Sequence, residues 1–363
     1  MLVSPNIYDL SKQTNWRRLV VKFKKLFISF ILLYVFASGC VKKVPCYPPE
    51  HYAADPGAPY TAEEVSVLTS KGYNLAGTLT LPTMGTPPYP AVLLITGSSP
   101  QERDHMQDRR APVSNYRPFR QIADAISRKG IAVLRMDDQG TGCSAGDQLE
   151  NVTIQERADD GRAGIAYLRR RKEIDGNRIG LLGLSEGANI GPMIAASDPS
   201  IRAVVMMAPT ASNGYKIEEY QRRRMIDERS DLTAAQKKRA LEKSMRGLDQ
   251  ALARGEGSPW FRSFLEYMPL PTVKKVFCPA LILHGDKDAH IPVEHSQLLE
   301  KVMRSSGNND VTLIIFRNHN HLFLEDPNGN ISGYADLLLH TYQLSENVLS
   351  TITDWLSFQL LVK

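Results

Sequence analysis

Residues 183–187, Gly-Leu-Ser-Glu-Gly, join an apolar run of buried-strand length at residues 178–182 to a stretch with helical spacing at residues 188–197. A serine on a sharp turn from a strand into a helix adopts a strained backbone conformation, and small flanking residues let that turn close. The hydroxyl then stands clear of the backbone, and the N–H of the next residue points at the group that the serine attacks. This context predicts that Ser185 is a nucleophile, with a structural turn as the alternative.

A serine hydroxyl attacks only when a base takes its proton and an acid orients that base. Two later predicted strands are each followed by a pair of suitable residues: Asp286 and Asp288 after residues 279–283, and His319 and His321 after residues 311–316. The carboxyl ends of parallel strands meet at one edge of an open α/β sheet, where active sites assemble. The pattern therefore predicts a serine, an acid and a histidine at that edge, and it leaves the choice within each pair open.

These segments resemble the α/β-hydrolase superfamily, and within it a bacterial branch of carboxylesterases and serine-aminopeptidase-like proteins. The acid of that family commonly ends a Gly-x-x-Asp turn followed by Val/Ile-Pro, and residues 285–288 and 291–292 match this pattern. Residues 320–323, Asn-His-Leu-Phe, resemble the Asn-His-x-Phe segment of the esterase branch. The resemblance thus favours Asp288 and His321 as partners of the serine.

The resemblance extends to a loop that supplies a second oxyanion donor in this family. Residues 97–104 are similar to the Gly-Ser-Gly-Pro-Gln-Asp-Arg-Asp loop of the esterase branch, with Ser99 and Glu102 replacing glycine and aspartate. It implies that the backbone N–H groups of Ser98 and Glu186 stabilise the oxyanion.

Two groups of charged residues have competing interpretations. Arg103 and Asp104 either contact the substrate or form an ion pair that braces the loop. Residue types that bind metals also cluster after the acid's strand, at His284, Asp286, Asp288 and His290. Their near-adjacency on one turn and the competing triad role argue against a metal site. We expect neither a metal nor a cofactor.

The remaining pattern predicts one α/β domain over residues 61–363. A chain of 363 residues, 42% of them hydrophobic, is long enough to bury one such core. Helices are predicted at residues 119–128, 153–171, 293–303 and 345–361, and an antiparallel strand pair at residues 64–68 and 75–81. The resemblance implies the α/β-hydrolase fold, a mostly parallel central sheet flanked by helices.

A helical cap insertion is expected at about residues 211–272. Charged, strongly helix-forming stretches replace the strand–helix alternation there, at the position where the superfamily inserts a cap. A cap over the serine would shut out water and shape the acyl pocket. Large apolar side chains of this region, Trp260 and Phe264 among them, either line that pocket or pack the cap onto the core.

Residues 1–39 have the order of a secretory signal peptide, with lysines, an apolar stretch and then small residues before Cys40. The apolar stretch is short for a bilayer span, which takes roughly 20 residues. The segment resembles a bacterial lipoprotein signal, which implies lipidation of Cys40 and a lipid-anchored protein of the cell envelope. An uncleaved signal anchor is the alternative. The proline-rich residues 40–60 are predicted to form an extended tether.

Charge and cysteine content narrow the choice of partners. The leader holds six basic residues and one acidic residue, so it accounts for the whole formal charge of +5 and leaves 38 basic and 38 acidic residues. Nucleic-acid binding is therefore not expected. If Cys40 is acylated, at most one disulfide forms within the chain. Cys143 is expected to be a small buried side chain.

We expect a serine hydrolase that cleaves carboxylic esters of a small-molecule acyl substrate through an acyl-enzyme intermediate. A peptidase, amidase or acyltransferase using the same triad is an alternative. A non-catalytic, envelope-anchored binding protein that retains the fold is another. The sequence carries no signal for an oligomeric state.

Overall fold

The computed structural model describes residues 44–106, 116–331, 334 and 343–362. The predicted signal peptide and Cys40 lie outside these residues. None of the helices in the described ranges is long and apolar enough to cross a membrane.

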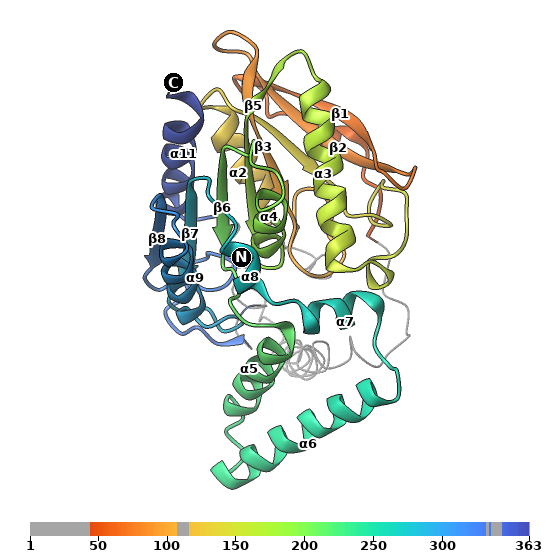
Figure 1. The fold of residues 1–363 in the computed structure, drawn as a ribbon, viewed down its shortest axis with the longest axis vertical. Coiled ribbons are helices and arrows are strands. Elements are labelled where there is room, and N and C mark those ends of the chain that lie inside the picture. Colours follow the sequence, from red (N-terminus) through yellow and green to blue (C-terminus); the bar gives the residue numbers. More distant parts are fainter. Residues whose placement is uncertain (1–43, 107–115, 332–333, 335–342, 363) are drawn as a thin grey trace, which may run out of the picture.

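One mixed sheet organises the described part of the chain (Figure 1). Its strands are β1 (Tyr60–Leu68), β2 (Asn74–Pro82), β3 (Tyr89–Ile95), β4 (Ala132–Met136), β5 (Ile174–Leu184), β6 (Ala203–Met207), β7 (Ala280–Gly285) and β8 (Val311–Phe316). Their order is β1-β2-β4-β3-β5-β6-β7-β8. β1 pairs with β2 and β2 with β4 in antiparallel fashion, and every later pairing is parallel. The predicted antiparallel start and parallel body are both confirmed.

Helices cover both faces of the sheet, and their positions follow from buried side chains at helical spacing. The first face carries α3 (Ile154–Arg170), α4 (Gly187–Ala195) and α9 (Glu294–Ser305); the second carries α2 (Pro118–Ser127) and α11 (Glu346–Leu361). Proline opens α2, and Thr153 with Glu156 forms a capping box at the start of α3. The four helices expected from the sequence are thus present.

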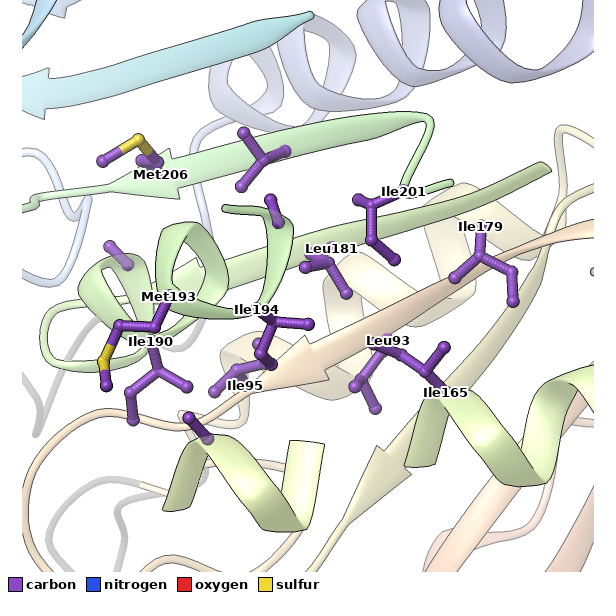
Figure 2. Packing of buried hydrophobic residues seen from close by; sticks show 14 of the residues in the cluster. Leu93, Ile95, Ile165, Ile179, Leu181, Ile190, Met193, Ile194, Ile201 and Met206 are labelled. Atoms are coloured by element: carbon purple, nitrogen blue, oxygen red, sulfur yellow. The ribbon is translucent and has the colours of Figure 1, made fainter. Parts of the chain in front are cut away.

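Two hydrophobic clusters hold these layers together, one on each face. Adjacent side chains of β3 point into different clusters: Leu93 belongs to the first and Val92 to the second. This alternation makes a central strand apolar on both sides. Figure 2 shows Leu93 of β3 and Leu181 of β5 packed near Ile194 of α4 in the first cluster.

Four helices lie between β6 and β7, where the sequence predicts a cap. They are α5 (Gly214–Asp227), α6 (Ala234–Ala253), α7 (Pro259–Glu266) and α8 (Pro269–Val273), which we call the helical insert. α6 projects away from the sheet, and α7 runs between it and the core (Figure 1). Leu248, Phe261 and Leu265 form a small cluster of their own, against which Trp260 and Phe264 pack. The large apolar side chains of the insert therefore serve its packing.

The proline-rich segment differs from the expected free tether, because residues 44–60 dock on the core. Pro49–Tyr52 forms a short 3₁₀ helix, η1. Tyr52 is buried beneath the guanidinium of Arg103, whose Cζ lies 4.1 Å from the ring centroid. Prolines prevent a long helix, but they leave individual side chains free to pack.

A disulfide between Cys46 and Cys143 also ties this segment to the loop after β4. The expectation for Cys143 is therefore wrong, since the residue is exposed and disulfide-bonded. Sequence spacing did not reveal the bond because the two cysteines are 97 positions apart. Within the described ranges, Cys278 is the free cysteine.

Candidate active site

The turn between β5 and α4 holds Ser185 in the left-handed region, with φ of 59°. Non-glycine residues rarely adopt this conformation. The glycines on either side are required by close backbone approach. A Cβ on Gly183 would lie 2.0 Å from the carbonyl oxygen of Gly187, and one on Gly187 would lie 2.1 Å from that of Ile95. The turn therefore presents the Ser185 side chain at the carboxyl edge of the sheet.

Asp288 and His321 are brought together in the loops after β7 and β8. The Nδ1 atom of His321 lies 2.7 Å from Oδ2 of Asp288. Oδ1 of Asp288 accepts hydrogen bonds from the backbone N–H groups of His290 and Ile291, at 2.7 and 2.9 Å. The carboxylate is thus fixed in place and aimed at the imidazole.

The neighbouring candidates take other roles. Asp286 is exposed and accepts the backbone N–H of Asn318. His319 lies with Nδ1 2.7 Å from the carbonyl oxygen of Arg317 and with Nε2 against Ser345. Neither side chain is hydrogen-bonded or ion-paired to Asp288 or His321 in the part of the chain that the structure describes.

His284 is a further partner of the acid, and the sequence pattern did not assign it this role. It is fully buried at the end of β7, with Nε2 3.2 Å from Oδ2 of Asp288 and Nδ1 2.6 Å from Oγ of Ser296. Burial alone would raise the pKa of Asp288, but His321 and His284 together hold it far below its usual value. The acid is therefore ionised at neutral pH.

The two proposed oxyanion donors lie on segments that touch. The loop after β3 packs against the turn. This closeness is seen at Gly97, where an added Cβ would lie only 3.3 Å from the Cβ of Ser185. Ser98 follows directly, and Glu186 follows Ser185. Among the described residues, neither the Ser98 nor the Glu186 N–H donates a hydrogen bond.

One more histidine, His290, lies beside His321, and another, His105, lies against the loop after β3. Nδ1 of His105 accepts a long 3.5 Å hydrogen bond from the Gly97 N–H. Burial lowers the pKa of His105 to about 3, with smaller contributions from the charges of Arg157 and His321. The ring of His290 lies 5.0 Å from that of His321, and burial lowers its pKa to about 4. Both are neutral at neutral pH. His105 was not singled out from the sequence, and His290 was considered only as a metal ligand.

Arg103 and Asp104 both brace the loop, although they do not pair with each other. Arg103 binds both carboxylate oxygens of Asp137 and reaches Glu64 at 2.6 Å. Asp104 pairs with Arg135 and, at 2.7 Å, with Arg117. Of the two interpretations that the sequence allowed, these contacts favour bracing.

Ser185 is not hydrogen-bonded to His321 in this structure, as far as the described residues show. Such hydrogen bonds are often long without substrate and tighten when it binds. In the described ranges, no group of three or more His, Cys, Asp or Glu is arranged to hold a metal ion.

The known proteins whose sequences are similar to this chain are hydrolases. Residues 162–328 match the model of the family described as BAAT / Acyl-CoA thioester hydrolase C terminal. Esterase EstD of Thermotoga maritima is 27% identical over 268 residues, which cover 73% of this chain and 61% of EstD. Esterase FrsA of Yersinia pestis is 29% identical over 154 residues, covering 42% of this chain and 32% of FrsA. The matched part thus spans less than two thirds of either relative.

Comparison with solved structures gives the fold. The Pyrococcus furiosus esterase Pf2001 aligns with a TM-score of 0.55 at 17% identity, over 87% of this chain and 95% of that one. The α/β hydrolase GrgF of Penicillium aligns with a TM-score of 0.55 at 18% identity, over 83% and 99%. The chain has the α/β-hydrolase fold, and its relatives support an esterase-like hydrolase.

The close approach at the turn predicts the effect of one added methyl group. Gly187→Ala should destabilise the protein by about 3 kcal/mol, because the methyl group has no room beside the Ile95 carbonyl. Gly247→Ala is the matched control, since a Cβ there meets nothing within 4 Å on α6, and it should stabilise by about 0.5–1 kcal/mol. Urea unfolding followed by circular dichroism measures both. A Gly187→Ala protein as stable as the wild type would contradict the packing.

Proposed function

We propose that the protein is a serine hydrolase that cleaves carboxylic esters. Ser185 is the nucleophile, His321 the general base and acid, and Asp288 the group that orients the imidazole and stabilises its charged form. The observation that carries the proposal is the 2.7 Å contact between Asp288 and His321 at the sheet edge that also presents Ser185. The esterase names of the relatives support the same reaction class.

In this mechanism His321 Nε2 takes the proton as Ser185 Oγ bonds to the acyl carbon. The carbonyl oxygen becomes an oxyanion, which the N–H groups of Ser98 and Glu186 stabilise; loss of one such donor typically costs about 3–4 kcal/mol. Collapse expels the alcohol, which receives the proton from His321. Water then attacks the acyl-enzyme by the same steps, so that the acid leaves and Ser185 is restored.

Acyl-CoA thioesters are a second candidate substrate class, because residues 162–328 match a thioester hydrolase family model. The same acyl-enzyme chemistry would also serve an amidase, a peptidase or an acyltransferase. A panel of p-nitrophenyl esters, acyl-CoA thioesters, amides and acyl acceptors separates these activities. Amide or thioester turnover above ester turnover would contradict our choice.

We also propose that the protein is exported and anchored through a lipid on Cys40. The disulfide between Cys46 and Cys143 supports export, because disulfides persist in oxidising compartments such as the periplasm and cell surface. On this proposal a docked catalytic domain begins within a few residues of the anchor.

The triad predicts distinct effects for two neighbouring aspartates. Asp288→Asn should lower kcat by about 10⁴, since the imidazole loses its orientation and charge partner. Asp286→Asn is the matched control and should keep wild-type activity, because the new side chain still accepts the Asn318 N–H. A fluorophosphonate probe should label the wild type at Ser185 and leave Ser185→Ala unlabelled. Labelling of Ser185→Ala, or equal loss in both asparagine variants, would contradict the assignment.

The anchor predicts a change in fractionation. Expressed in a bacterial host, the wild type should be found in the membrane fraction with a diacylglyceryl group on Cys40, detected by mass spectrometry of the N-terminal peptide. Cys40→Ala should lack the lipid. A wild-type protein with an unmodified Cys40 would overturn the proposal.

A further inference from the structure

A single buried guanidinium joins the two segments that carry the proposed oxyanion donors. Arg157 lies in the first turns of α3, and its NH1 is 2.8 Å from Oε1 of Glu186. Its NH2 donates to Oγ1 of Thr96 at 2.8 Å and lies 3.2 Å from Oδ1 of Asp138. Asp138 in turn accepts the backbone N–H of Gln101 at 3.0 Å. Glu186 is thus tied to both ends of the loop that contains Ser98.

The charges in this network depend on each other because Arg157 and Glu186 are buried and Asp138 is nearly so. Burial alone would lower the pKa of Arg157, but the carboxylates of Glu186 and Asp138 raise it overall. Burial raises the pKa of Asp138, which Arg157 and Thr96 partly oppose. Removing one partner from such a set leaves an unpaired buried charge, which strongly destabilises a fold. Changes at Arg157 therefore report on folding as well as on catalysis.

The helical insert reaches the same carboxylate through one side chain. Nε1–H of Trp260, on α7, donates to Oε2 and Oε1 of Glu186 at 3.0 and 3.2 Å. The indole is stacked on Phe264 with 5.5 Å between ring centroids, which fixes its orientation. Three residues further on, Ser263 Oγ accepts the backbone N–H of Ile154 at the start of α3. α7 is thus docked both on the turn after Ser185 and on the helix that carries Arg157.

We propose that Trp260, Glu186 and Arg157 form a positioning cluster through which docking of the helical insert sets the two oxyanion donors. The side chain of Glu186 is held from two sides, by Arg157 of the core and Trp260 of the insert, so its own backbone N–H is held as well. Because Arg157 also binds Thr96, the same cluster fixes the spacing between the Glu186 and Ser98 N–H groups. Oxyanion donors stabilise the transition state only within about 2.7–3.1 Å of the oxygen. The three side chains act through backbone placement, and it is the Glu186 backbone N–H, not its carboxylate, that would contact the oxyanion.

This inference rests on the proposed serine hydrolase and adds a consequence to it. A displaced donor weakens transition-state binding and leaves ground-state binding nearly unchanged, so it lowers kcat and spares KM. A side chain that only lined the acyl pocket would change KM, and would do so least for the smallest acyl group. p-Nitrophenyl acetate therefore separates the two roles.

The test is Trp260→Phe in the full chain, which removes the indole N–H and keeps an aromatic ring against Phe264. We expect kcat for p-nitrophenyl acetate to fall about tenfold, a fraction of the loss seen when a whole donor is removed, with KM within about twofold of the wild type. The rate of Ser185 phosphonylation should fall by a similar factor. Trp355→Phe is the matched control, because Trp355 packs in the cluster on the other face of the sheet, and its kcat should be unchanged.

A double-mutant cycle with Glu186→Gln tests whether Trp260 acts through Glu186. Each single variant should lower kcat. The kcat of the double variant should fall no further than that of the worse single variant, because both substitutions break the same Trp260–Glu186 contact. Additive losses, an unchanged kcat in Trp260→Phe, or a rise in KM alone would overturn the positioning cluster. Failure of the wild type to label at Ser185 would instead reject the proposed function. If Trp260→Phe folds poorly by circular dichroism, a Glu186→Gln protein with wild-type kcat still overturns the cluster.

Discussion

Backbone contact at the turn after β5 is the constraint on which the candidate site depends. The strand ends so close to the start of α4 and to the end of β3 that Gly183 and Gly187 admit no side chain. Ser185 is thereby held at positive φ, and the loop with Ser98 is brought against it. Ser185 and the loop that contains Ser98 are positioned by one local packing arrangement, which does not involve Asp288 or His321.

Buried ionic groups hold the surrounding loops in register with that turn. Arg103 with Asp137 braces the loop after β3, and Arg157 with Glu186 and Thr96 ties that loop to the turn. Such pairs contribute little net stability when compared with apolar side chains, but they tolerate few alternative arrangements. Their role here is to fix the geometry of an irregular loop at the edge of the sheet, where no helix or strand holds the chain.

Local patterns in the sequence carry most of the fold and part of the candidate site. Apolar runs bounded by turns located the strands, and the order of serine, acid and histidine after strand ends pointed to one sheet edge. The family resemblance chose Asp288 and His321, and the structure places these two in contact. Periodicity alone does not distinguish Asp286 from Asp288, or His319 from His321, because the two residues of each pair follow the same strand.

Contacts between distant segments were beyond those patterns. The Cys46–Cys143 bond and the docking of Trp260 on Glu186 each join residues more than 70 positions apart. His284 was visible in the sequence, but its role depends on the path of the chain from β7 to Asp288. No spacing rule encodes such pairings, since they are decided by how the packed elements meet.

The most direct measurement is a crystal structure of the protein with a boronic acid bound, which mimics the tetrahedral intermediate. The account predicts a covalent bond from boron to Ser185 Oγ and His321 Nε2 within about 3 Å of that oxygen. A boronate oxygen should lie within about 3 Å of the Ser98 and Glu186 N–H groups. An adduct in which the imidazole of His321 stays beyond about 5 Å from Ser185 Oγ would contradict the proposed proton relay.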